Sequence, residues 1–161
     1  MRFLRLHHWL LVSRRLLAAR RLLIVALLLA SPGAQADPTL LAAINAERQR
    51  AGLSALQADA ALDKAALAHA ADLARCGQLS HRGCDGSELP DRLRRAGYAY
   101  AFAAENIALG TENAAATLAA WLESPPHRAN LLRPEPDAAG IGRAEQDGRP
   151  LWVLVLGRRY P

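Results

Sequence analysis

The chain has 161 residues, of which 52% are hydrophobic and 5% aromatic, and it carries 20 basic against 15 acidic side chains. The positive excess belongs to the N-terminus, because residues 1–36 hold six arginines and no acid, which leaves 14 bases against 15 acids in the rest of the chain. Since the charges of residues 37–161 are mixed in sign, the composition excludes a nucleic-acid-binding protein that works through bulk positive charge.

The N-terminal segment has the three-part layout of a secretory signal peptide. A basic stretch precedes nine uninterrupted apolar residues at 22–30, and Ala34-Gln35-Ala36 supplies a cleavage motif. A membrane-spanning helix needs about 20 apolar residues, and this run is shorter and is followed by Pro32. A retained membrane anchor and a twin-arginine export signal at Arg14-Arg15 are the alternatives.

We therefore expect a signal peptide at residues 1–36 and a single domain at residues 37–161. After cleavage we expect no membrane span and a secreted or periplasmic bacterial protein. The domain is expected to be a monomer.

The first part of the domain has helical patterns. Asp37-Pro38 predicts the start of a helix that Gly52 ends, and an Ala-rich amphipathic pattern predicts a second helix from Asp59 to about Arg75. His69 lies on the apolar face of this second helix. We expect a buried, hydrogen-bonded core histidine there.

Cys76 and Cys84 are the only cysteines, and outside the cytosol an even count predicts a disulfide. Closing such a short loop is worth about 2 to 3 kcal/mol. The loop contains His81, so the disulfide would also restrict where that imidazole points.

The middle of the chain alternates short elements. Ser87 to Ala96 is predicted to be a short helix, and the alternation from Tyr98 to Phe102 favours an extended segment. Thr111 is predicted to cap an Ala-rich helix that Ser124-Pro125-Pro126 terminates. A short helical piece is expected from His127 to Leu132.

The chain ends in a predicted β-hairpin of Ala138 to Glu145 and Leu151 to Gly157. Asp147-Gly148 marks the turn, and Pro150 suggests a loop longer than two residues. The last strand is apolar on both faces, so both faces should be covered, and helices are the only other material available. This predicts an α+β fold in which helices sandwich an antiparallel or mixed sheet.

Three residues of the domain are candidates for chemistry. His81 and His127 lie in predicted loops beside residues that favour exposure, and Glu105 follows an apolar segment, which we expect to end there. Two imidazoles and one carboxylate suit a zinc ion with an open position, and other divalent metals of similar character. The spacings of 24 and 22 positions do not test this idea, and no His-x-x-x-His or cysteine cluster supports it. No serine has a recognisable nucleophile setting.

Eight segments in order resemble one family, the CAP superfamily or SCP domain, which includes cysteine-rich secretory proteins, antigen 5, plant pathogenesis-related proteins and many exported bacterial members. The resemblance covers about residues 40–157. The segments are Asn45-x-x-Arg48-x-x-x-Gly52-Leu53-x-x-Leu56, Ala68-His69-Ala70-x-Asp72, Ser80-His81, Asp85-Gly86, Arg92-x-x-x-x-Gly97, Ala104-Glu105-Asn106-Ile107-Ala108, Trp121-x-x-Ser124-Pro125-x-His127-Arg128-x-Asn130-Leu131-Leu132 and Gly140-Ile141-Gly142.

The resemblance implies a three-layer α-β-α sandwich with a mostly antiparallel sheet and a central cleft of two histidines and acidic residues that can hold a divalent metal. His81, Glu105 and His127 match the cleft positions. Asn106 matches a supporting position that bonds backbone near the site, and Ser80 supports the cleft beside His81.

Two positions depart from the family pattern. Eukaryotic members place a second cleft glutamate where this chain has Ser124, and Glu123, one step earlier, would point about 100° away around a helix. Bacterial relatives usually have glycine where this chain has Pro126, so the loop before His127 must accept a φ near −65°.

Three functions remain open at this point. The first is a non-catalytic extracytoplasmic binding module for an envelope, lipid or host protein ligand. Its cleft would hold one divalent metal, for which zinc is the first choice. The second is a zinc-dependent hydrolase in which Glu105 is the general base. The third is a structural partner of another envelope protein. No organic cofactor and no nucleic acid are implied.

Overall fold

The computed structural model describes residues 37–161, and the predicted signal peptide at residues 1–36 lies outside the described residues. Four strands form one sheet in the order β1-β3-β4-β2. β1 (Gln57–Ala58) pairs in parallel with β3 (Ala138–Gln146), while β3 with β4 (Arg149–Arg159) and β4 with β2 (Tyr100–Leu109) pair antiparallel. The sheet is therefore mixed and mostly antiparallel, as expected.

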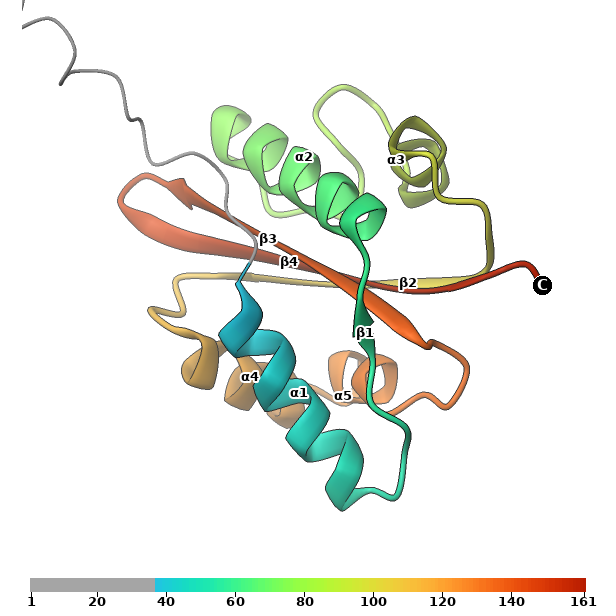
Figure 1. Cartoon of the computed structure of the whole chain (residues 1–161). Helices are drawn as coiled ribbons and strands as arrows, with labels where there is room; N and C mark the ends of the chain where they lie inside the picture. The colour runs from blue at the N-terminus through green and yellow to red at the C-terminus, as the bar shows by residue number, and fades with distance from the viewer. Residues whose placement is uncertain (1–36) are drawn as a thin grey trace, which may run out of the picture. The chain divides into compact units, whose positions relative to one another are not determined.

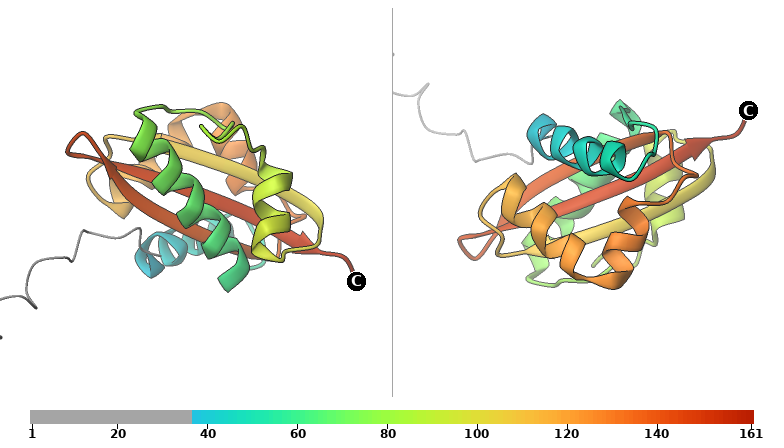
Figure 2. Two further views of the ribbon diagram at one scale, coloured as in Figure 1. Left: turned by 90° about the horizontal axis from the view of Figure 1, so that it is seen from above. Right: turned by 90° about the horizontal axis from the view of Figure 1, so that it is seen from below.

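Helices cover both faces of this sheet (Figures 1 and 2). α2 (Ala60–Cys76) and α3 (Leu89–Ala96) lie on one face, and α1 (Pro38–Arg50), α4 (Ala114–Glu123) and α5 (Pro125–Leu131) lie on the other. The side chains of β4 from Leu151 to Leu156 alternate between these layers and are buried. Leu151, Val153 and Val155 belong to the core under α2 and α3, and Trp152, Leu154 and Leu156 to the core under α1 and α4. The three-layer α+β prediction is confirmed.

Side-chain caps set the starts of the two longest helices where the sequence predicted them. The carboxylate of Asp37 accepts hydrogen bonds from the backbone of Thr39 and Leu40, and that of Asp59 from Ala61 and Leu62. Each cap satisfies backbone N–H groups that have no partner inside the helix.

Two predicted boundaries in the α4–α5 region are wrong. Asn113, rather than Thr111, caps α4, because its side chain accepts from the backbone N–H of Ala116. The two prolines after Ser124 form the first turn of α5 instead of a break before it. Proline is well suited there, since N–H groups of a first turn have no helical partner.

The hairpin loop has two residues, so the longer loop that Pro150 suggested is wrong. Gln146 pairs with Arg149, and Asp147 and Gly148 adopt φ values of 51° and 73°, as a type I′ turn requires. The carbonyl of Pro150 accepts from the backbone of Gly110 (2.8 Å), on the side away from β3. The missing N–H of Pro150 faces that same side, so no bond between β3 and β4 is lost.

Two polar residues of the family-like segments tie the loops to α1. Arg48 is buried and donates to the carbonyls of Ser54, Leu131 and Arg133 at 2.8–2.9 Å. Asn45 exchanges two hydrogen bonds with the backbone of Leu56. These contacts place the short strand β1 beside β3. Within residues 37–161, the helices fall short of the length and apolar character that a membrane crossing needs.

Candidate functional site

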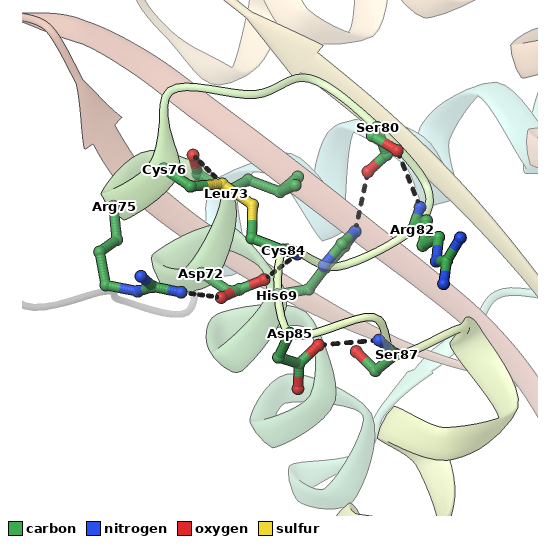
Figure 3. The surroundings of a disulfide bond; sticks show 10 residues. All are labelled: His69, Asp72, Leu73, Arg75, Cys76, Ser80, Arg82, Cys84, Asp85 and Ser87. Atoms are coloured by element: carbon green, nitrogen blue, oxygen red, sulfur yellow. Dashed lines mark hydrogen bonds and ion pairs between the residues drawn. A yellow bond between two sulfur atoms is a disulfide. The ribbon is translucent and has the colours of Figure 1, made fainter.

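The loop between α2 and α3 is held at several points (Figure 3). Cys76 and Cys84 form the predicted disulfide. The carboxylate of Asp72 accepts from the backbone N–H of Cys84 (2.6 Å), and Nε2 of His69 lies 3.1 Å from the carbonyl oxygen of Ser80. Ser80 and His81 therefore sit on a segment fixed from α2 as well as by the disulfide.

Glu105 is the buried centre of a polar cluster, which we call the Glu105 cluster: His69, His81, Arg92 and Glu105. Oε1 of Glu105 lies 2.8 Å from Nδ1 of His81 and 3.7 Å from Nε2 of His69. Oε2 accepts from Nη2 of Arg92 at 2.7 Å. The side chains of Glu105 and Arg92 are 3% and 4% exposed, so this is a buried ion pair, whereas His81 is 62% exposed.

The position of Glu105 differs from the sequence interpretation. It does not follow the end of an extended segment, because β2 continues to Leu109 and places Glu105 in its middle. Successive strand residues point to opposite faces. Glu105 therefore faces α2 and α3, while Asn106 faces α5.

Asn106 is fully buried and positions the other half of the site. Its Nδ2 donates to the carbonyl oxygen of His127 (3.0 Å), and its Oδ1 accepts from Asn130 (2.9 Å). Asn130 also donates to the carbonyl of Glu105 (3.3 Å). Two adjacent residues of the edge strand β2 thus hold one histidine from each helical layer.

The three histidines differ in their pKa. The hydrogen bond to Glu105 raises the pKa of His81 above its ordinary value, against the effect of partial burial. Burial lowers the pKa of His127, and the charge of His81 lowers it further. Burial also lowers the pKa of His69.

Within the described residues, the three metal ligands that the resemblance implies do not form a group that could hold an ion. Both oxygens of Glu105 already accept hydrogen bonds or ion pairs from protein groups. Among residues 37–161, no group of three or more His, Cys, Asp or Glu side chains is placed to hold an ion. The hydrogen bond from Nδ1 of His81 leaves its Nε2 available, and carboxylates commonly orient metal-binding imidazoles in this way. Glu105 fits a supporting role better than a ligand role.

Both departures from the family pattern lie at the α4–α5 junction. Ser124 is both the C-cap residue of α4 and the N-cap residue of α5. Glu123, the last residue of α4, is exposed. Pro126 falls in the first turn of α5, so its fixed φ suits the backbone there. His127 follows directly and is half-buried.

Arg92 and His69 belong to the cluster although the sequence analysis assigned them no site role. Arg92 also donates to the carbonyls of His81 (3.1 Å) and Ser87 (3.0 Å), so it links the loop to β2. The sequence pointed to Arg92 only through the family-like segment Arg92-x-x-x-x-Gly97. His69 was expected in the core, where it does lie, but its contacts reach the site.

Comparison with known proteins shows consistent similarity. A model of the cysteine-rich secretory protein family, CAP, matches residues 41–156. "Uncharacterized protein YkwD" of Bacillus subtilis is 36% identical over 101 residues, which are 63% of this chain and 39% of that protein. The chain therefore spans about two fifths of the length of this curated relative.

Solved structures share the fold. An outer surface protein from Borrelia burgdorferi has a TM-score of 0.70 and 25% identity, with 76% of this chain and 91% of that one covered. An extracellular protein containing an SCP domain from Bacillus anthracis has a TM-score of 0.71 and 28% identity, over 75% of this chain and 39% of that one. A cysteine-rich secretory protein from Staphylococcus aureus, at 19% identity, a TM-score of 0.60 and coverage of 74% and 37%, shows the fold alone.

Proposed function

This chain belongs to the cysteine-rich secretory protein (CAP) family, and from that premise we propose that it is a non-catalytic extracytoplasmic binding domain whose cleft carries His81 and His127. The ligand class that we propose is a component of the cell envelope, a lipid or a host protein. The extracellular and outer-surface descriptions of two structural relatives support an exported location.

The observation that carries this proposal is the occupied carboxylate of Glu105. A general base must have an oxygen free to take a proton from water. Here Arg92 neutralises one oxygen at 2.7 Å and His81 bonds the other at 2.8 Å, in a setting with almost no solvent access. The zinc-dependent hydrolase is the second candidate, and this arrangement disfavours it.

We further propose that His81 and His127 can hold one divalent metal, with zinc the best match to two imidazoles. A bound metal would supply Lewis acidity at the cleft. Glu105 would keep the His81 ring in one orientation through Nδ1, and Asn106 would fix the backbone of His127. The remaining ligands would come from water or from the bound molecule.

Calorimetric zinc titration of the full chain tests the metal part. The parent should bind zinc, and His81→Ala and His127→Ala should each weaken binding at least about tenfold, because each removes one of two ligands. Glu123→Gln is the matched control, since it removes an exposed acid four positions before His127 and leaves both imidazoles in place. Equal heats in the parent and both histidine variants would remove the metal from the proposal.

The binding part is tested by sedimentation with purified peptidoglycan and by flotation with phosphatidylglycerol vesicles. We expect the full chain to bind at least one of these, and His81→Ala to bind less. Binding to neither would favour the third function, a structural partner of another envelope protein. Zinc-dependent hydrolysis of a peptide, ester or glycan library that Glu105→Gln abolishes would restore the hydrolase.

A further inference from the structure

A groove lies between α3, the start of β2 and the C-terminus of the chain, which meet at one end of the sheet (Figures 1 and 2). Its volume is about 580 Å³, and ligand pockets commonly have about 300 to 1,000 Å³. We call it the tyrosine groove, because its lining includes all three tyrosines of the chain, Tyr98, Tyr100 and Tyr160. The rest of the lining is proline, glycine, alanine and a single charged residue, Arg94.

Two of the three tyrosines are accessible at this groove. Tyr160 is 68% exposed, and among the large hydrophobic residues of the described chain only Leu79 is comparably exposed, at 55%. Tyr100 is half-buried and packs against the core under α2 and α3. Tyrosine is enriched at binding interfaces, because its ring is apolar while its hydroxyl bonds polar partners. Two accessible tyrosines on one groove therefore indicate an interaction surface.

The third tyrosine makes the wall of the groove rigid. Tyr98 is 2% exposed, and the guanidinium carbon of Arg159 lies 4.2 Å from the centre of its ring. Asp59 holds that guanidinium at 3.0 Å. A Cβ at Gly157 would come within 2.7 Å of the Tyr98 hydroxyl, so β4 lies directly against this side chain. The groove is thus largely preformed, and binding needs little ordering of the protein.

The side chains of the lining favour a neutral ligand that accepts hydrogen bonds. Arg94 is the only charged residue of the lining, and its Nη2 already bonds Asp91 at 2.7 Å, so the groove has no unpaired charge to attract an acidic or basic partner. The guanidinium and the phenols all donate hydrogen bonds. The only side-chain acceptors of the lining are the phenolic oxygens.

We propose that the tyrosine groove binds a proline-rich segment of a partner protein in the polyproline II conformation. Prolyl rings pack on aromatic side chains, and a proline offers a carbonyl acceptor without an N–H that would need an acceptor in the groove. Such segments are preformed and dock into aromatic-lined grooves at a low entropic cost. A glycan would also stack on tyrosines, but its hydroxyls need acceptors as well as donors.

The tyrosine groove is separate from the cleft of the proposed function and does not depend on a metal. Tyr100 precedes Glu105 by five residues on β2, which is roughly 16 Å along a strand. The result of a test at the groove is therefore independent of the result at the cleft.

Titration of the full chain with a proline hexapeptide blocked at both ends tests the site. The signals to follow in NMR spectra are the backbone amides of Gly97, Ala99 and Ala101, which line the groove, and we expect them to shift and saturate. A blocked glycine-serine hexapeptide is flexible and has no rings, so it should bind at least about tenfold more weakly. Shifts that never saturate, or equal affinity for the two peptides, would overturn the proposal. Tighter binding of a chitin hexasaccharide at the same amides would overturn it in favour of a glycan.

Tyr160→Ala is the blocking variant, because it removes an exposed ring just beyond the end of β4 and leaves the core intact. It should weaken binding of the proline hexapeptide at least about fivefold, and Tyr160→Phe, which keeps the ring, should weaken it less. Leu79→Ala removes the other well-exposed side chain, on the disulfide loop, and should leave binding as in the parent. Circular dichroism of the variants checks the fold, and equal hexapeptide affinity of Tyr160→Ala and Leu79→Ala would refute the assignment.

Discussion

At the level of single residues, the site depends on one buried charge pair. Glu105 and Arg92 are both almost free of solvent and lie 2.7 Å apart. A buried carboxylate without its partner is far more costly than the pair is favourable. The pair therefore matters to stability mainly because breaking it would leave a buried charge without a counter-ion.

Arg92→Met should lower the free energy of unfolding by about 3 to 5 kcal/mol, because it leaves Glu105 buried with no compensating charge. The measurement is urea unfolding of the full chain at pH 7. Arg94→Met breaks the exposed pair with Asp91 and should cost less than about 1 kcal/mol. Equal losses in the two variants would show that burial of the Glu105 pair has no special cost.

His81 should make stability depend on pH in a defined direction. Its pKa is raised in the folded state, so its contribution is complete below the unfolded value of about 6.5 and is lost as the pH rises through the folded value. The loss of unfolding free energy on His81→Ala should therefore be larger at pH 5.5 than at pH 8.5.

His127→Ala is the matched comparison, measured by the same urea unfolding at both pH values. The pKa of His127 is lowered in the folded state, so this histidine opposes folding as the pH falls, and the difference between parent and variant should change with the opposite sign. The same slope in both variants would contradict the assigned roles of Glu105 and burial.

The sequence identified side chains with local signals better than it identified contacts that are made across the fold. His81, Glu105 and His127 could be named as candidates from their neighbours and from family-like segments. Arg92 could not be assigned a role, because its contacts to Glu105 and to the carbonyl of His81 are made across the fold. Hydrogen-bond partners this far apart in sequence leave no local pattern.

At the level of secondary-structure elements, α2 packs against β3 through two glycines. A Cβ at Gly140 would overlap backbone atoms of Leu62 and Asp63, and a Cβ at Gly142 would overlap those of Ala66 and Leu67. The side-chain carboxylate of Asp63 also accepts from the backbone N–H of Ile141 at 2.8 Å. The helix therefore lies directly on the strand, and the Gly140-Ile141-Gly142 segment has a packing role.

Gly142→Ala should destabilise the protein by about 1 to 3 kcal/mol, because the added methyl pushes α2 away from the sheet. Ala101→Val adds bulk at an exposed position of β2 and should change stability by less than about 0.5 kcal/mol. Thermal and urea unfolding measure both. Gly142→Ala with stability equal to the parent would show that α2 can move off the strand without loss.

Elements with their own caps and periodic burial could be predicted, and elements that depend on a distant partner could not. Asp37 and Asp59 lie at the helix starts where the sequence placed them. β1 has two residues, both exposed, so it shows no alternation and exists only through its pairing with β3. Thr111 and Asn113 are both good caps on composition, and only the backbone geometry separates them.

At the level of the whole domain, β4 joins two cores through one strand. Leu151 lies in the core under α2 and α3, and Leu154 in the core under α1 and α4. Trp121 and Trp152 both belong to the second core. Their fluorescence therefore reports one side of the sheet, while circular dichroism reports helices on both sides.

Leu151→Ala and Leu154→Ala should each cost about 2 to 5 kcal/mol, because both leucines are fully buried. If the two cores unfold as a unit, each variant shifts the fluorescence and circular dichroism transitions in urea to the same new midpoint. Leu151→Ala that shifts circular dichroism but leaves the fluorescence midpoint in place would show that the two layers unfold independently.

The alternation of Glu105 and Asn106 along β2 also constrains how this chain can change in length. An insertion or deletion of one residue that reached these positions would exchange the carboxylate and the amide between the two layers. The acid would then meet α5, and Arg92 would lose its counter-ion. The pairing of β2 with β4 is irregular between Tyr100 and Phe102, upstream of both residues. A β-bulge at such a point can absorb one extra or missing residue, so that the alternation of Glu105 and Asn106 is kept.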